Sequence, residues 1–183
     1  MSRTVVITKE EIINAAFKIT KREGFEAVTS RKLAAAAGCS TQPIFRAYKN
    51  MEELKTDVYE RTAAFYEAYY EQYQKTNITP FVDLGMAYID FALKYPNLFR
   101  LLFLADREDK LKSMYDLVNG TGDYVVKEVD KARSLGVRNA QQLFMKMWIF
   151  IHGAGCMACT GDYDLPSDES VSMLTGAYDA FKE

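Results

Sequence analysis

The first fifty residues carry so many helix start and stop signals that only short helices fit between them. A Thr followed three residues later by a Glu has capping-box spacing, in which each side chain satisfies a backbone N–H at the other's position. Glycines after helical-period apolar residues mark helix ends, and a Pro fits a helix's first turn. These signals are Thr8 with Glu11, Gly24, Thr29 or Ser30, Gly38, and Ser40 or Thr41 with Pro43. They predict three helices, the last two short and joined by a tight turn.

The rest of the 183-residue chain has the pattern of further helices. Asn50 can cap a long fourth helix from about Met51 to Lys75, and apolar residues at helical spacing follow each later break. No segment has the alternation of a strand, so we expect an all-α fold. Its predicted parts are an N-terminal three-helix unit, residues 1–50, and a larger helical bundle, residues 51–183. The breaks are Pro80, Pro96, Asn119–Gly122, Gly136 and residues 161–167.

Charge is divided unevenly between these two parts. The chain has a net charge of -2, yet residues 1–50 hold nine Lys or Arg against four Glu, which is +5, and the remainder is -7. A basic segment joined to an acidic one suggests that the first meets a polyanion while the second would be repelled by it. Solvation of helix faces by Lys and Arg is the alternative explanation of the charge.

The short helix, tight turn and short helix of the first part are the components of a helix-turn-helix, whose second helix enters the major groove of DNA. Apolar or small residues that would close these helices against the first one are Leu33, Ala34, Ala37, Ile44 and Phe45. Residues left pointing outward are Thr41, Gln42, Pro43, Arg46 and Lys49. Gln can read adenine, Thr and Pro can touch a thymine methyl group, and Arg and Lys reach guanine or phosphate.

Residues 8–55 resemble the TetR family of bacterial transcriptional regulators, in register and without a gap. The matching segments are IINAA (12–16), GFEAVT (24–29), LA (33–34), AGCS (37–40) and IFRAYKNMEEL (44–54). The resemblance implies a homodimeric, ligand-responsive regulator, most simply a repressor released from a palindromic double-stranded DNA operator by a small molecule. It also implies that the second part of the chain binds the ligand and forms the dimer.

Carried over by position, the resemblance assigns Thr29 and Arg31 to phosphate contacts. It assigns Thr41, Gln42 and Pro43 to base reading, and Phe45, Arg46 and Lys49 to backbone or mixed contacts.

Two positions depart from the family pattern. Phe45 stands where the family usually has Tyr, which removes a hydroxyl-to-phosphate hydrogen bond, and Met51 stands where it usually has Lys. Both departures would weaken non-specific DNA affinity.

Two later segments, YPNLFRLLF (95–103) and WIFIHG (148–153), resemble elements of one large subgroup of the family. In those relatives the last two helices form the dimer. We therefore expect the dimer interface, called the seam below, to lie on residues 143–159 and 169–181, where small residues permit close approach of the helices. The small residues are Gly153, Gly155, Ala158, Gly176 and Ala177, and the apolar stripe of the last helix is Val171, Leu174 and Tyr178.

Twenty of the 24 aromatic residues lie beyond residue 50. Tyr, Phe and Met can line an apolar cavity with a few hydroxyls for orientation, so we expect a site for an apolar or aromatic small molecule. The candidate lining residues are Tyr66, Tyr88, Phe91, Phe103, Tyr115, Met147 and Trp148. Each of them can equally be ordinary core.

Other function classes find little support in the sequence. His152, Cys156 and Cys159 share one helical face, which raises metal or thiol sensing as an alternative, but a zinc site needs a fourth ligand. No catalytic motif is recognisable, so we expect no enzyme, no catalytic or metal-ligating residue and no cofactor. A helical enzyme or ligand carrier with a degenerate helix-turn-helix is the second alternative.

Three cysteines are too few and odd in number for a secreted disulfide framework. The N-terminal apolar run is too short for a signal peptide, and no stretch of about 18 uncharged apolar residues follows. We therefore expect a cytoplasmic protein without a membrane segment.

Overall fold

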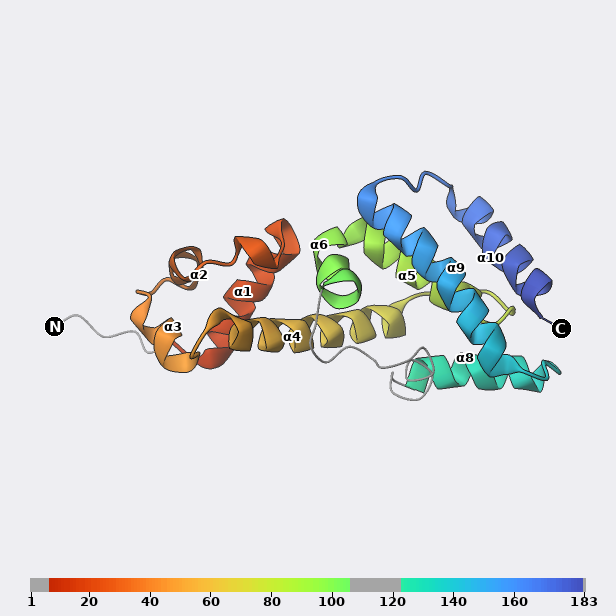
Figure 1. Cartoon of the computed structure of the whole chain (residues 1–183), viewed down its shortest axis with the longest axis horizontal. Helices are drawn as coiled ribbons and strands as arrows, with labels where there is room; N and C mark the ends of the chain where they lie inside the picture. Colours follow the sequence, from red (N-terminus) through yellow and green to blue (C-terminus); the bar gives the residue numbers. More distant parts are fainter. Residues whose placement is uncertain (1–6, 106–122, 183) are drawn as a thin grey trace. The chain divides into compact units, whose positions relative to one another are not determined.

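The computed structural model describes residues 7–105 and 123–182, and every regular element in these two ranges is helical (Figure 1). The predicted all-α fold is therefore confirmed. Between α1 and α2 lies a 3-10 turn, η1, and η2 is a short π-helix that follows α6. The bounds are α1 (Lys9–Glu23), η1 (Phe25–Ala27), α2 (Ser30–Ala37), α3 (Gln42–Ala47), α4 (Met51–Gln72), α5 (Val82–Lys94), α6 (Pro96–Phe99), η2 (Arg100–Leu104), α8 (Asp123–Ser134), α9 (Ala140–Thr160) and α10 (Ser167–Phe181).

The described residues form two compact units. The first contains residues 7–68 and Tyr95–Ala105, and the second contains Tyr69–Lys94 and residues 123–182. Helix α4 contributes residues to both, and it ends at Gln72, three residues earlier than predicted. The predicted functional boundary between residues 50 and 51 stays a prediction.

The helix caps of the first unit follow the sequence signals. Thr8 Oγ1 accepts a hydrogen bond from the Glu11 amide over 3.2 Å, and the Thr8 amide donates to the Glu11 carboxylate over 2.8 Å. Thr29, the first of the two predicted candidates, caps α2 by accepting from the Lys32 amide. Gly38 ends α2 with a left-handed backbone, φ 68°.

The core of the first unit closes α1, α2 and α3 against the start of α4. Its fully buried side chains include Ile12, Leu33, Ile44 and Leu54. Met51, where the family usually has Lys, packs partly buried against this core. The apolar side chain at position 51 therefore adds contact area to this core, which explains locally why it stands in place of a charged one.

A second contact within the first unit holds the end of α1 to α6. The ammonium group of Lys21 lies over two aromatic rings, 4.9 Å from the centroid of Phe65 and 4.4 Å from that of Tyr95. The two rings also meet edge to face, with centroids 5.2 Å apart. Such cation–π contacts are favourable by about 0.5–2 kcal/mol.

The second unit is built around α5, which is buried at every position from Val82 to Ile89. Helices α9 and α10 pack on α5, and α8 packs on α9. A Cβ atom added at Gly85 would lie 2.9 Å from Leu174 of α10 and 3.1 Å from Ile151 of α9. This glycine therefore permits the close approach of three helices.

The link from α4 to α5 has an unusual backbone. Phe81 is fully buried and has φ 66°, a left-handed conformation that costs a bulky residue of order 1–3 kcal/mol. Its amide donates a 2.6 Å hydrogen bond to the buried carboxylate of Glu128 in α8. Asp83, also buried, accepts from the Asn77 amide over 3.0 Å. Two buried carboxylates thus fix the path of the link.

Among the described helices, α9 is long and apolar enough to cross a membrane by length and composition alone. Because α9 contains Lys146, it is not the stretch of about 18 uncharged apolar residues that the sequence lacks. Eight of its residues are buried against the rest of the second unit. This is the arrangement of a core helix, which passes the same test.

Candidate functional site

The third helix, α3, separates its side chains into an inner and an outer face. Ile44 and Tyr48, one turn apart, are 2% and 3% exposed. Phe45 is 61% exposed, and Gln42 and Arg46 are exposed beside it. The outer face thus joins an amide, an aromatic ring and a guanidinium group, which are the groups that read base edges and bind phosphate.

The prediction that Phe45 helps to close the helices against one another is wrong. Its neighbour Ile44 fills that place, because adjacent residues of a helix point in directions about 100° apart. Among residues 7–68, Phe45 is the one large apolar side chain that is mostly exposed. Exposure leaves it available for its other predicted role, a contact with DNA.

Tyr48 anchors α3 from the inner side. Its hydroxyl donates a 2.8 Å hydrogen bond to Asp57 of α4, and the Lys9 ammonium lies 2.7 Å from the same carboxylate. Burial, and then the bond to Asp57, raises the pKa of Tyr48. Burial acts to raise the pKa of Asp57, but the hydrogen bonds from Lys9 and Tyr48 outweigh it and the pKa is lowered. The Tyr48 hydroxyl is therefore already hydrogen-bonded within the protein.

The remaining predicted DNA contacts lie at the starts of α2 and α3 and just after α3. Thr41 and Pro43 are partly exposed at the start of α3, and the Thr41 side chain makes no capping bond. Thr29 and Arg31 are exposed at the start of α2, and Lys49 is exposed just after α3. Their roles stay predictions, since the structure contains no DNA.

The predicted effector residues fall into both units. In the first unit, Tyr66 and Phe103 meet edge to face with ring centroids 5.4 Å apart. In the second unit, the ring centroids of Tyr88 and Trp148 lie 5.0 Å apart, and Met147, which precedes Trp148 in α9, is fully buried. The remaining two are Phe91, whose ring lies 5.4 Å from that of Tyr69, and Tyr115, which lies outside the described residues.

Of the three proposed donors of the metal or thiol alternative, His152 and Cys156 lie in contact with each other, and Cys159 is buried. The Tyr88 hydroxyl lies 2.8 Å from His152 Nδ1, and Cys156 Sγ lies 3.6 Å from His152 Nε2. Burial lowers the pKa of His152 and raises the pKa of Cys156. Both shifts favour the neutral forms, so burial works against a reactive thiolate. Within residues 7–105 and 123–182, no three His, Cys, Asp or Glu side chains group as metal ligands.

Helices α9 and α10 carry an exposed apolar face. On α9, Ile149 and Met157 are 63% and 49% exposed, and Gly153 lies between them one turn from each. On α10, Met173 is 51% exposed, and Gly176 follows one turn later. A Cβ atom added at either glycine would meet no atom within 4 Å.

The predicted apolar stripe of α10 is wrong as an outer surface. Leu174 and Tyr178 are buried within the second unit, at 1% and 5% exposure, and Val171 is partly buried. Leu174 packs where Gly85 makes room for it. The exposed face of α10 is therefore not the face that carries Leu174 and Tyr178.

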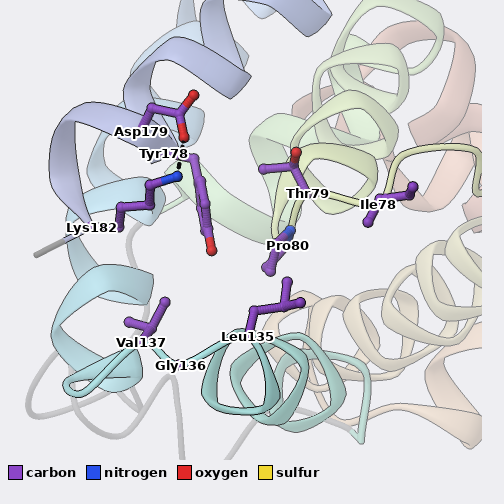
Figure 2. A pocket seen from close by; sticks show the side chains of 9 residues that line it. All are labelled: Ile78, Thr79, Pro80, Leu135, Gly136, Val137, Tyr178, Asp179 and Lys182. Atoms are coloured by element: carbon purple, nitrogen blue, oxygen red, sulfur yellow. Dashed lines mark hydrogen bonds and ion pairs between the residues drawn. The ribbon is translucent and has the colours of Figure 1, made fainter.

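A surface hollow of about 520 Å³ lies in the second unit, and no residue of the predicted effector set lines it. Figure 2 shows its walls, which come from the link before α5, the turn between α8 and α9, and the end of α10. In the sequence, Pro80 and Gly136 are recognisable only as helix breaks. The sequence signals were present, but nothing in the sequence brings these three segments together.

Two family models match the chain. Residues 12–57 match the bacterial regulatory proteins of the tetR family, and residues 81–178 match a tetracyclin repressor-like C-terminal domain. No curated protein sequence matches.

Solved structures with the same fold cover almost the whole chain. A TetR-family transcriptional regulator from Vibrio parahaemolyticus is 17% identical, with TM-score 0.64, over 95% of this chain and 98% of that one. A TetR-family regulator from Haemophilus influenzae is 19% identical, with TM-score 0.62, over 95% and 96%. MexZ, a repressor from Pseudomonas aeruginosa, is 16% identical, with TM-score 0.59, over 96% and 94%.

Proposed function

Because the chain belongs to the TetR family of bacterial regulatory proteins, we propose that it is a homodimeric repressor that a small molecule releases from a palindromic operator. Members of this family are DNA-binding transcription regulators and not enzymes, and they dimerise. Beyond these family properties, we propose repression as the direction of regulation, the residues that contact DNA, the location of the seam and the class of effector. A regulator of this kind acts in the cytoplasm, where the DNA lies.

The outer face of α3 is the observation that carries the DNA-binding part. Phe45 is mostly exposed beside Gln42 and Arg46, on the part of the chain that has a charge of +5 over residues 1–50. Positive charge supplies the salt-dependent attraction to phosphate, and a Gln can bond to adenine through two atoms. Thr29 and Arg31 at the start of α2, with Lys49 after α3, supply further phosphate contacts.

The exposed apolar face of α9 and α10 supports a dimer. One helix-turn-helix with a handful of phosphate contacts binds DNA weakly, whereas two held about 34–36 Å apart reach successive turns of the major groove. Ile149, Met157 and Met173 would be removed from water by a second copy, and Gly153 and Gly176 leave room for it.

The effector is proposed to be apolar or aromatic. The residues predicted for it form two separate sets, one in each unit, and each set offers aromatic faces, with a polarisable sulfur in the second. The sets are Tyr66 with Phe103, and Tyr88 with Phe91, Met147 and Trp148. To release the protein from DNA, the effector must bind the free and DNA-bound conformations with different affinity. A helical ligand carrier stays the alternative, because it would bind a ligand without binding DNA.

Binding to DNA tests the proposal and its residue assignments together. The wild-type protein should select a palindromic site from a random duplex library and bind it with a steep salt dependence. Lys49→Ala should weaken binding to all sequences and flatten the salt slope by about 0.9 per lost phosphate contact. Gln42→Ala should instead relax the preference at one base pair of each half-site, by about 1–3 kcal/mol.

Failure to select any site would contradict the DNA-binding function and favour the ligand carrier. Equal loss of specificity from both variants would contradict the residue assignments while leaving the function intact.

A further inference from the structure

The hollow in the second unit has one buried polar side chain directed into it. Tyr178 is only 5% exposed, and Figure 2 shows its ring entering from α10, with the hydroxyl directed into the space between Pro80 and the Leu135–Val137 turn. Within the described residues, no protein group forms a hydrogen bond with this hydroxyl. Every fully buried side-chain oxygen of the described residues has a hydrogen-bond partner. Because the Tyr178 hydroxyl has none, it is not fully buried and opens onto the hollow.

Two other tyrosine hydroxyls of the described residues are bonded within the protein. Tyr48 donates to Asp57 over 2.8 Å, and Tyr163 donates to Ser170 over 2.8 Å. Burial raises the pKa of Tyr178, so its hydroxyl keeps its proton and can act as a donor. A donor that is held on a buried ring and opens onto a hollow can bond to the acceptor atom of a ligand.

The opposite walls of the hollow are apolar and unusually exposed. Ile78 is 83% exposed and Leu135 is 55% exposed, and both line the hollow with Pro80 and Val137. Covering such side chains is worth about 25 cal/mol for each Å² of apolar surface removed from water. A ligand here would therefore need an apolar body.

The charged groups at the rim are already paired. Lys182 forms an ion pair with Asp179, and its ammonium lies 5.2 Å from the centroid of the Tyr178 ring. The two charges offset each other, so this pair gives the rim no net charge that would attract an ionised ligand. The rim therefore favours an uncharged ligand.

We propose that this hollow binds a small uncharged amphipathic molecule, whose apolar body covers Ile78 and Leu135 and whose acceptor atom receives the Tyr178 hydroxyl. The volume of about 520 Å³ lies within the range of small-molecule sites, about 300–1,000 Å³. The site is separate from the effector residues proposed above, and its occupancy does not require that the protein bind DNA.

Three benzene derivatives of similar size separate the features of the proposed ligand. Acetophenone is neutral and has a carbonyl acceptor, ethylbenzene lacks the acceptor, and benzoate is ionised. Methyl signals of Ile78, Leu135 and Val137 in the nuclear magnetic resonance spectrum of the full chain would report binding at the hollow itself. Acetophenone should shift these three signals saturably, and with higher affinity than the other two compounds.

Two variants test the two halves of the site. Tyr178→Phe removes only the hydroxyl, and it should weaken acetophenone about three- to tenfold, the effect of one neutral hydrogen bond, while leaving ethylbenzene unchanged. Leu135→Ser should weaken acetophenone and ethylbenzene alike. Tyr163→Phe is the matched control, because it removes a tyrosine hydroxyl bonded to Ser170 and should change neither affinity.

The site is overturned if acetophenone gives no saturable shift of these methyl groups up to its solubility limit. Equal binding of acetophenone by Tyr178→Phe and the wild type would overturn it too, provided that circular dichroism shows both to be folded. DNA binding measured on the same samples keeps the two proposals apart. Retained DNA binding without probe binding contradicts the site alone, and the reverse contradicts the regulator alone.

Discussion

The hydroxyl of Tyr48 donates a hydrogen bond to Asp57, and this 2.8 Å contact joins the residue that ends α3 to the middle of α4. Tyr48 is 3% exposed and the Lys9 ammonium lies 5.0 Å from the centroid of its ring, so the bond is partly buried. The orientation of the outer face of α3 therefore depends on a polar contact made on the inner face.

Replacing Tyr48 by Phe should lower the free energy of unfolding by about 1–2 kcal/mol, because one partly buried hydrogen bond to a carboxylate is lost with no change of shape. Urea unfolding followed by circular dichroism measures the change. Lys9→Met removes only the exposed partner of Asp57 and should cost less. A stability equal to wild type for Tyr48→Phe would show that the bond contributes nothing.

Phe45 should read thymine through its C5-methyl group, since it is exposed on α3 and has no hydroxyl to offer to phosphate. Replacing thymine by uracil at each position of a selected site removes only that methyl group. We expect a weaker complex at one thymine of each half-site with the wild type, and no difference at that position with Phe45→Ala.

The variant Phe45→Tyr supplies the contrasting result. Its hydroxyl can reach phosphate, so the dependence of binding on salt should steepen by about 0.9 for each new contact. Thymine and uracil bound equally by the wild type at every position would assign Phe45 to the DNA backbone or to no contact.

The dimer should depend on the exposed face of α9 and α10. Met157→Glu or Gly176→Glu would place charge in an apolar seam and should give a helical monomer of 20.8 kDa that no longer binds a palindrome tightly. Sedimentation equilibrium measures the mass. Val126→Glu, which adds the same charge at an exposed apolar position of α8, should stay dimeric. A wild type that is monomeric at micromolar concentration and still binds a palindrome tightly would contradict this assembly.

Stability should fall as the pH is lowered through the region of His152 titration. Burial lowers the pKa of His152 from its ordinary value of 6.5, so the unfolded chain binds more protons than the folded one just below that pH. The part of stability due to His152 is therefore complete above about pH 6.5–7 and is lost as the pH falls toward the folded pKa. Urea unfolding between pH 8 and pH 5 should show a shallower loss for His152→Gln than for the wild type.

The link between α4 and α5 should loosen when Glu128 is changed. Glu128→Ala leaves the buried Phe81 amide without an acceptor, at a cost of about 1–3 kcal/mol, whereas Glu128→Gln keeps an acceptor oxygen. Hydrogen exchange of the Phe81 amide should accelerate far more in the Ala variant. Unchanged exchange would mean that packing of the Phe81 ring alone holds the left-handed backbone.

Local signals predicted the parts of the fold that local interactions determine. The Thr8–Glu11 capping box, the Thr29 cap and the Gly38 helix end require only neighbouring residues, and all three are confirmed. The direction in which Phe45 points is settled by competition with Ile44 for one space in the core. Sequence alone could not decide between two adjacent apolar residues.

The second unit was harder to predict, because its features depend on segments far apart in the chain. Leu174 points inward since Gly85 leaves a space for it, and Phe81 adopts φ 66° in a structure where Glu128 accepts its amide. The hollow combines three segments that each look like an ordinary helix break. None of these features has a signature within a short window of sequence.

The contact at Gly85 limits how the second unit can transmit a signal. With Leu174 and Ile151 within about 3 Å of a Cβ position, α5 cannot slide along α9 or α10 without a collision. We therefore expect the second unit to respond to a bound ligand by moving α5, α9 and α10 together, as one rigid body.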